Sequence, residues 1–277
     1  MPGKHRAKAQ EAEALERERK AIGSGLNFAS AEAFKRLRTN IIFALPHDKS
    51  CRVLGVTSSV RGEGKSTTAL NLAYMLAEAG EWVLLMEADM RLPTVARRLA
   101  VKHSPGLSNL LAGVSCAEDV VQSSGLNPQL RVVTAGDLPP NPSELLGSRQ
   151  MGNLVEEFGR DFSYIIIDLP PVTAVTDALI VSKLTDGLVM AVRQNYATRR
   201  ELDDAMRQLE YTQAKILGFV MTDAAKGSQG GKYGRYNKNY KHQCTRGYKR
   251  YKEMFQICRV EKSDFPLYFY ILAGCAD

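Results

Sequence analysis

The residues of this chain best suited to chemistry lie in the segment SVRGEGKST, residues 59–67. Glycines let a backbone wrap closely around a phosphate, and the amide groups at a helix start attract its negative charge. In such a segment the lysine reaches the terminal phosphates and the following hydroxyl binds magnesium. The sequence therefore predicts a phosphate-binding loop whose cofactor-binding residues are Gly62, Glu63, Gly64, Lys65, Ser66 and Thr67.

One position of this loop departs from the usual pattern GxxxxGK[ST]. The pattern begins with glycine, and this chain has Ser59 there. Serine is small enough to turn at that position. The alternative is an ordinary glycine-containing turn with an incidental lysine. The apolar strand at 53–56 and the helix expected from Lys65 favour the phosphate loop.

Two further segments place carboxylates directly after apolar runs. Glu87 and Asp89 follow residues 82–86, and Asp168 ends the run YIIID. Strand ends of an open parallel sheet face the ligand crevice, so these acids belong near the loop. Asp168 could instead be a simple strand-capping aspartate. Together with the loop, it predicts a magnesium site formed by Ser66 and Asp168, as phosphoryl transfer requires.

The elements that would position these residues alternate between strands and helices. Helical spacing of apolar residues and capping signals predict a helix from Ser30, with Ser30 as N-cap, and a helix closed by Gly80. Ser143 is expected to cap a helix that runs to Phe158. This alternation predicts an α/β fold with a doubly wound, mainly parallel sheet. Further helices are expected at 94–99, 107–111, 117–122, 172–183 and 198–211, and further strands at 130–134, 187–192 and 216–221.

Charge and composition divide the chain. It has 277 residues and a formal net charge of +7, and residues 226–252 contain nine Lys or Arg and no acid. Five cysteines without a CxxC pair indicate neither a disulfide framework nor a zinc site. No apolar run approaches the roughly 18 residues of a membrane span. Five tyrosines lie within the basic segment: Tyr233, Tyr236, Tyr240, Tyr248 and Tyr251.

Taken together, these motifs resemble the bacterial tyrosine kinases of capsule and exopolysaccharide synthesis. The resemblance runs in order from Leu26 to Tyr251. It rests on AEAFKRLRTNI, SSVRGEGKSTTALNLA, VLLMEADMRLP, GLSNLLAG, LPPNPSELL, YIIIDLPP, VTDALIVSKLTDG, ILGF and the tyrosine-rich tail. It implies a P-loop NTPase fold of the deviant Walker A, A′ and B type. The domains it implies are a charged arm at 1–25, a kinase domain at 26–225, a tail at 226–253 and an extension of unknown role at 254–277.

The resemblance also implies roles for particular residues. ATP and Mg²⁺ would be the cofactors of a non-specific protein-tyrosine kinase, with Lys65, Glu87, Asp89 and Asp168 as catalytic residues and Ser66, Asp89 and Asp168 as metal ligands. The family normally has aspartate where this chain has Glu87, whose arm is one methylene longer. A misplacement on the order of 1 Å can cost ~100-fold in rate, which predicts reduced activity. The five tail tyrosines would be phosphorylated by a neighbouring subunit.

Partners follow from the same resemblance. The helix motif ExxRxxR, which mediates ring-like self-association in the family, appears as Glu32, Lys35 and Arg38. A transmembrane activator of the polysaccharide co-polymerase type would recruit this cytoplasmic chain to the inner face of the plasma membrane. A protein-tyrosine phosphatase is a further expected partner. Nucleic acid is not an expected partner, although tyrosines among basic residues could also form an arm that binds single-stranded nucleic acid.

Two other functions remain open at this point. A switch ATPase of the chromosome- or septum-positioning type shares the sheet and the A′ motif. That class has an early lysine in its loop, where this chain has Val60, with Arg61 one place off. The third possibility is a weakly active nucleotide-binding scaffold, which the change to Glu87 allows.

Overall fold

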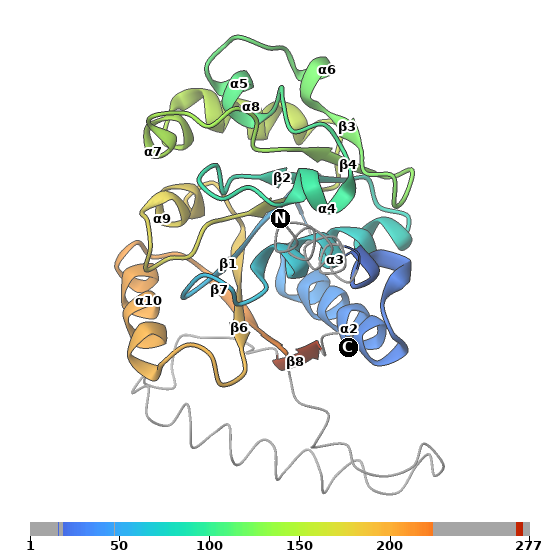
Figure 1. The fold of residues 1–277 in the computed structure, drawn as a ribbon, viewed down its shortest axis with the longest axis vertical. Helices are drawn as coiled ribbons and strands as arrows, with labels where there is room; N and C mark the ends of the chain where they lie inside the picture. The colour runs from blue at the N-terminus through green and yellow to red at the C-terminus, as the bar shows by residue number, and fades with distance from the viewer. Residues whose placement is uncertain (1–15, 17–18, 47, 224–269, 274–277) are drawn as a thin grey trace, which may run out of the picture. The chain divides into compact units, whose positions relative to one another are not determined.

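A computed structural model gives the fold of the chain (Figure 1). It describes residue 16, residues 19–46 and 48–223, and the backbone of residues 270–273. The tail at 226–253 with its five tyrosines, most of the N-terminal arm and most of the extension at 254–277 lie outside the described residues.

One sheet of eight strands forms the centre of the fold, in the order β3-β4-β2-β5-β1-β6-β7-β8. All neighbouring strands are parallel except β3, which runs antiparallel to β4. The mainly parallel, doubly wound sheet is therefore confirmed. The strands are β1 (Arg52–Ser58), β2 (Val83–Glu87), β3 (Gln122–Ser123), β4 (Leu130–Val133), β5 (Tyr164–Asp168), β6 (Gly187–Arg193), β7 (Ile216–Thr222) and β8 (Tyr270–Ala273).

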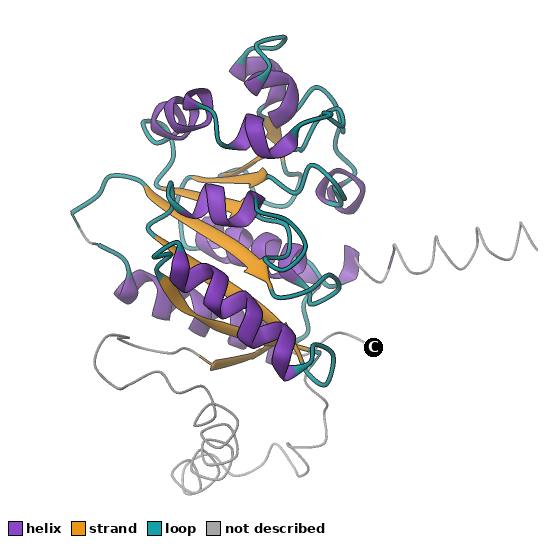
Figure 2. Cartoon of the chain, turned by 90° about the vertical axis from the view of Figure 1, so that its left-hand side faces the viewer, coloured by secondary structure: helices purple, strands orange, loops and turns teal. Residues whose placement is uncertain are grey.

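Helices cover both faces of this sheet (Figure 2). In Figure 1, α2 and α3 lie to one side of the sheet and α9 and α10 to the other. The helices are α2 (Phe28–Ala44), α3 (Lys65–Glu78), α4 (Val95–Leu99), α5 (Leu107–Leu111), α6 (Ala117–Val120), α7 (Pro142–Leu146), α8 (Arg149–Phe158), α9 (Asp177–Ser182) and α10 (Arg199–Tyr211), with a short 3₁₀ turn η1 (Gly23–Gly25).

Helix α3 is the most deeply buried helix next to the sheet. Eleven of its fourteen residues are buried, because α2 covers the side that the sheet does not. A helix that is apolar on most sides is stable only where neighbours enclose it, and each fully buried leucine contributes about 1.5–3 kcal/mol. This burial fixes the N-terminal end of α3, which carries the phosphate loop, against the centre of the sheet.

Two predicted helix caps are wrong. Helix α2 begins at Phe28, because the Asn27 side chain accepts a hydrogen bond from the Ser30 amide at 2.9 Å and is therefore the N-cap. The helix expected from Ser143 to Phe158 is two helices, α7 and α8, and Ser148 caps the second. The Ser143 hydroxyl donates instead to Asp177, a residue distant in sequence.

Other boundaries differ at the ends of elements. The helix expected at 172–183 begins only at Asp177, since the prolines and turn before it keep the preceding residues out of a helix. Strand β8 lies within the extension at 254–277 and pairs with β7 along Phe219–Thr222, which the sequence did not predict. At the opposite edge the two-residue strand β3 was also missed, because so short a strand has no periodicity.

We expect Gly106 to be sensitive to substitution, because α5 approaches the chain after β4 closely there. A methyl group at Gly106 would lie 2.4 Å from Thr134 O and 2.4 Å from Gly136 N, both backbone atoms. Relief requires a backbone shift, so Gly106→Ala should lower the free energy of unfolding by about 1–3 kcal/mol in urea titrations. Gly152→Ala, whose added methyl group would lie 3.9 Å from the Leu184 side chain, is the control, and its free energy of unfolding should rise by about 0.5–1 kcal/mol. A parental midpoint for Gly106→Ala would contradict this close approach.

Candidate active site

The predicted phosphate loop lies between β1 and α3, at the centre of the sheet. Strand β1 ends at Ser58 and α3 begins at Lys65. Gly62 and Gly64 have φ angles of +89° and +83°, in the left-handed region that favours glycine. These two residues turn the loop so that it passes directly into the first turn of α3, whose amide groups can face an anion.

The Glu63 side chain points into the loop rather than out of it. Its carboxylate accepts hydrogen bonds from Ser59 Oγ at 2.6 Å, from Val60 N at 2.9 Å and from Arg193 N at 3.3 Å. Glu63 and Ser59 are fully buried. The serine that replaces the usual glycine therefore has a structural part, since its hydroxyl holds the acid that closes the loop.

Neighbouring strands hold the same loop from outside. The Thr222 hydroxyl at the end of β7 donates to Glu63 O at 2.8 Å. On the other side, the Thr173 hydroxyl donates to Ser59 O at 2.6 Å. The loop is thus fixed by the strands and turns on both sides of β1. The resemblance marks Thr222 as the position of an asparagine that usually follows the ILGF strand, but no local pattern identifies the contact of either threonine with the loop.

The predicted carboxylates gather at the carboxyl edge of the sheet. Glu87 and Asp168 are paired residues of β2 and β5, and Val56 of β1 is paired with Asp168. Lys65 Nζ lies 2.8 Å from Asp89 Oδ2 and 3.5 Å from Asp168 Oδ1. The structure therefore brings together Lys65 and the three acids, which lie far apart in the sequence.

Burial and charge act against each other in this cluster. Burial opposes the charged form of Lys65, but the carboxylates of Asp168 and Asp89 outweigh it, so the pKa of Lys65 lies above its ordinary value. Burial raises the pKa of Asp168, and Lys65 counteracts this effect. The lysine is thus a firmly positive group between two acids in a site with little access to water.

The donor set fits a magnesium ion with bound phosphate. Asp168 is fully buried, and its Oδ2 atom has no hydrogen-bond partner among the described residues. A buried carboxylate oxygen without a donor is costly unless a cation satisfies it. Magnesium prefers oxygen ligands and keeps most of its waters, so two carboxylates and one hydroxyl suffice. Ser66, Asp89 and Asp168 provide these groups.

Glu87 is fully buried, and backbone amides occupy both of its oxygens. Its Oε1 atom accepts from Thr94 N and from Val95 N, the latter at 2.8 Å, at the start of α4. Its Oε2 atom accepts from Ala135 N at 3.2 Å, after β4. Burial raises the pKa of Glu87 to about 7, although the amide hydrogen bonds oppose that shift. The carboxylate thus connects β2 to two neighbouring segments.

A second polar cluster joins segments that the resemblance left without a role. Arg91 Nε donates to Asp177 Oδ2 at 3.1 Å, and Arg91 Nη2 donates to Ser143 Oγ at 3.1 Å. The Ser143 hydroxyl also donates to Asp177, which is fully buried at the start of α9. This cluster connects the segment after β2 to α7 and α9.

The predicted self-association motif lies on α2. Lys35 Nζ lies 3.1 Å from Glu32 Oε1, and both side chains are half-buried. Arg38 instead turns toward α3 and donates to Met75 O at 2.9 Å. The motif is thus divided between an ion pair on α2 itself and a contact from α2 to α3.

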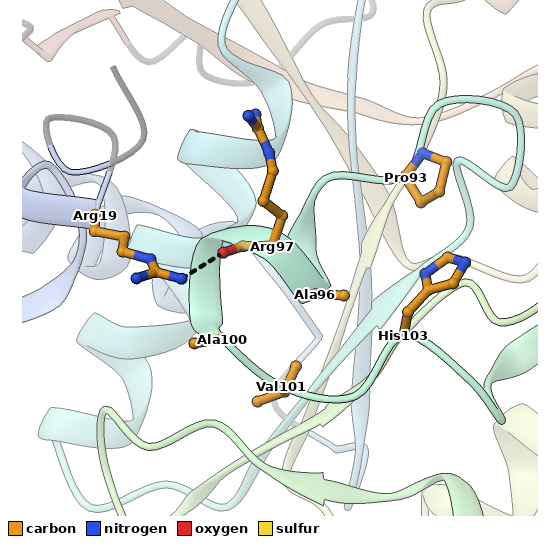
Figure 3. A pocket seen from close by; sticks show the side chains of 7 residues that line it. All are labelled: Arg19, Pro93, Ala96, Arg97, Ala100, Val101 and His103. Carbon is orange, nitrogen blue, oxygen red and sulfur yellow. Dashed lines mark hydrogen bonds between the residues drawn. The ribbon is translucent and has the colours of Figure 1, made fainter. Parts of the chain in front are cut away.

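A surface pocket, here called the outer pocket, lies beside α4 (Figure 3). Its volume is about 490 Å³, and Arg19 donates to Arg97 O across its rim at 3.0 Å. None of the predicted catalytic residues lines it. The lining residues are Arg19, Pro93, Ala96, Arg97, Ala100, Val101 and His103.

A glycine-turned loop between β1 and α3, with acids at the ends of β5 and β2, defines a P-loop protein of the nucleotide-binding class. A family model described as an AAA domain matches residues 51–216. The cell division ATPase MinD of Pyrococcus furiosus has a similar fold, with 21% identity and a TM-score of 0.54 over 63% of this chain and 73% of its own. At that identity the likeness shows the fold alone.

Comparisons at higher identity are more specific. Tyrosine-protein kinase YwqD of Bacillus subtilis is 38% identical over 207 residues, which are 75% of this chain and 86% of the relative. Tyrosine-protein kinase CpsD of Streptococcus agalactiae is 36% identical over 75% of this chain and 90% of its own. The kinase domain of Escherichia coli tyrosine kinase ETK superposes with a TM-score of 0.67 at 30% identity, over 75% of this chain and 80% of that domain. The chain belongs to the bacterial tyrosine kinase family, as its motifs implied.

Within the described residues, no helix has the length and apolar character that a membrane span requires.

The buried Glu87 carboxylate predicts a pH-dependent stability of the nucleotide-free protein. The folded state holds the proton up to about pH 7, whereas the unfolded chain releases it near pH 4.5. The free energy of unfolding should therefore fall between pH 4.5 and 7, relative to Glu87→Gln, by on the order of 3 kcal/mol. Above pH 7 the difference should be constant. Urea titrations at several pH values measure it.

Glu156→Gln, which changes an exposed glutamate of α8, is the matched control. Its stability should run parallel to that of the parent protein across the same pH range. If the free energies of unfolding of the parent and of Glu87→Gln also change in parallel with pH, the buried Glu87 carboxylate does not titrate as described.

Proposed function

We propose that this chain transfers the γ-phosphoryl group of ATP to tyrosine hydroxyls, and that its own tail tyrosines are the acceptors. The observation that carries the proposal is the contact of Lys65 with both Asp89 and Asp168 at the end of a glycine-turned phosphate loop. Membership of the tyrosine kinase family supports the choice of acceptor. Tyrosine phosphorylation in this chain would regulate capsule or exopolysaccharide synthesis.

The residues of the site have different roles in the proposed reaction. Ser66, Asp89 and Asp168 would hold magnesium, which when bound with ATP would supply positive charge at the phosphates. Loop amides and the start of α3 bind the phosphate chain, while Lys65 neutralises charge at the transferring group. The new bond joins the tyrosine oxygen to the γ-phosphorus, the bond from that phosphorus to the bridging oxygen breaks, and ADP leaves.

Glu87 is the group proposed to take the tyrosine proton. A carboxylate has about four acceptor positions, and backbone amides fill three of those of Glu87. A pKa of about 7 suits a general base near neutral pH. The same amides hold the longer glutamate arm in one place, which compensates in part for the change from aspartate.

The acceptor tyrosines are Tyr233, Tyr236, Tyr240, Tyr248 and Tyr251, which lie outside the described residues. We propose that each is modified by a neighbouring copy within a ring-like oligomer. Every phosphate adds about −1.5 to −2 charge, so modification would invert the charge of this basic segment. A protein-tyrosine phosphatase would restore the tail.

A membrane-bound partner completes the proposal. The solved chimerical protein CapA2B2 is 38% identical to this chain, with a TM-score of 0.66 over 70% of this chain and 84% of its own. We propose that a transmembrane activator of the polysaccharide co-polymerase type binds this chain at the inner face of the plasma membrane. ExxRxxR-type contacts through Glu32 and Lys35 would join the subunits of the assembly.

The direct test is incubation of the full chain with ATP and magnesium, with and without the cytoplasmic tail of a candidate activator. Mass spectrometry should find phosphate on the tail tyrosines. Lys65→Met should reduce this phosphorylation by at least 100-fold, because it removes the charge at the transferring phosphate. Lys183→Met, which changes an exposed lysine directly after α9, is the control. ATP turnover with unmodified tyrosines would favour the switch ATPase instead.

The role of Glu87 has its own test. Glu87→Gln retains an oxygen that can accept from the α4 amides but cannot take a proton. We expect phosphorylation to fall by about 100-fold or more, with the dissociation constant of MgADP unchanged. Glu156→Gln is again the control. A rate within threefold of the parent value would show that another group accepts the proton.

A further inference from the structure

Helix α4 contacts the start of α3 through one side chain that neither the motifs nor the proposed mechanism uses. Arg98 Nη1 donates to Thr67 Oγ1 at 2.6 Å. Thr67 is the third residue of α3, directly after Lys65 and Ser66. Figure 1 shows α4 beside α3, after the end of β2. The guanidinium of Arg98 therefore lies at the same helix terminus as the phosphate loop.

Helix α4 is fixed in this place by the acidic segment after β2. The Glu87 carboxylate accepts from the amides of Thr94 and Val95, and Asp89 Oδ1 accepts from Leu92 N at 3.1 Å. Val95 and Ala96, the first two residues of α4, are buried. The segment from β2 to α4 is thus held at several points, and Arg98 stands in its last turn, where its amide donates to Thr94 O at 3.1 Å.

The charge balance of the site favours a second basic side chain besides Lys65 at this place. Glu87, Asp89 and Asp168 lie around the loop, and Lys65 already contacts two of them. A nucleoside triphosphate brings several further negative charges. The positive charge of Arg98 is close enough to favour the ionised form of Asp168, so it acts on the interior of the site and not only on Thr67.

The chemistry of arginine suits phosphate at this position. A guanidinium is a planar group with five N–H donors, and the bond from Nη1 to Thr67 directs that group toward the start of α3. Its planar fork pairs with two phosphate oxygens at once, which an ammonium does not. Amides at the start of the helix after a phosphate loop cradle the α- and β-phosphates, while the loop lysine reaches the β- and γ-phosphates.

We propose that Arg98 is a further binding residue of the nucleotide site, which contacts the α- and β-phosphates of nucleoside di- and triphosphates from α4. This inference rests on the proposed nucleotide-dependent function. The two basic side chains then have different roles. Lys65 contacts the transferring γ-phosphate, and Arg98 contacts the α- and β-phosphates, which substrate and product have in common. The Arg98 contact is therefore made equally in the ground state and in the transition state, and it should lower KM without raising kcat.

The test compares Arg98→Gln with Arg97→Gln in the full chain. Arg97 is the preceding residue on the same helix and lines the outer pocket of Figure 3, so its variant removes the same charge outside the site. Calorimetry with MgADP and with the magnesium complex of a non-hydrolysable ATP analogue should give dissociation constants about tenfold higher for Arg98→Gln. Both nucleotides should lose affinity by similar factors. Arg97→Gln should bind as the parent does.

Kinetics and stability separate a binding role from a structural one. The KM for ATP should rise about tenfold in Arg98→Gln while kcat stays within twofold of the parent value. Thermal melting without nucleotide should show a folded protein. Parental affinity in Arg98→Gln overturns the inference, and so does an affinity loss that Arg97→Gln matches.

If Arg98→Gln does not fold, Arg98→Lys decides the question, because it retains the charge and loses the fork. At least a threefold loss of MgADP affinity in Arg98→Lys supports the inference, and parental affinity overturns it. Failure of the proposed function gives a different result. In that case the parent binds both nucleotides and leaves its tyrosines unmodified, whatever the affinity of the Arg98 variants.

Discussion

The buried contact of Lys65 with Asp89 and Asp168 is the interaction on which the rest of this structure depends. Carboxylates at the ends of two parallel strands repel each other and lose hydration when buried, so they are stable together only beside a cation. The lysine reaches them because α3 is enclosed by the sheet and α2 and cannot shift along its axis. The hydrophobic core thus sets the distance between the charges of the site.

Around this contact, buried side chains hold loops in place. Glu63 closes the phosphate loop from inside with help from Ser59, and Thr222 holds it from β7. Glu87 does the same for the start of α4 and the chain after β4. Each of these groups is polar and buried: the two carboxylates accept from backbone amides and from the Ser59 hydroxyl, and the Thr222 hydroxyl donates to a backbone carbonyl. Such bonds make the shape of the site rigid before any ligand binds, which reduces the entropy lost on binding.

The two departures from expected motifs have structural explanations in this network. Ser59 replaces a glycine, and its hydroxyl bonds to the Glu63 carboxylate. Glu87 replaces an aspartate, and its longer arm lets it accept from amides at the start of α4 and after β4. Compared with the family motifs, both residues are deviations. In the folded chain each one adds a connection, and the second connection fixes the helix that carries Arg98.

The sequence by itself determined the parallel α/β sheet, because short β-branched runs alternate with helices of the right period. It also determined the phosphate loop and the acidic strand ends, because their chemistry is concentrated in short, contiguous segments. The starts of helices were harder to predict. Asn27 rather than Ser30 caps α2, because both are capping residues three positions apart and only the folded backbone shows which side chain accepts the amide hydrogen bond.

Only the tertiary structure decided which distant groups meet. Arg98 and Thr67 are 31 positions apart, and Glu63 and Thr222 are 159 positions apart. Nothing in the local pattern around these residues indicates a partner, because the contacts arise from the order of strands in the sheet and from the burial of α3. The sequence predicts which residues can do chemistry, whereas the packing of the sheet against its helices selects the ones that face each other.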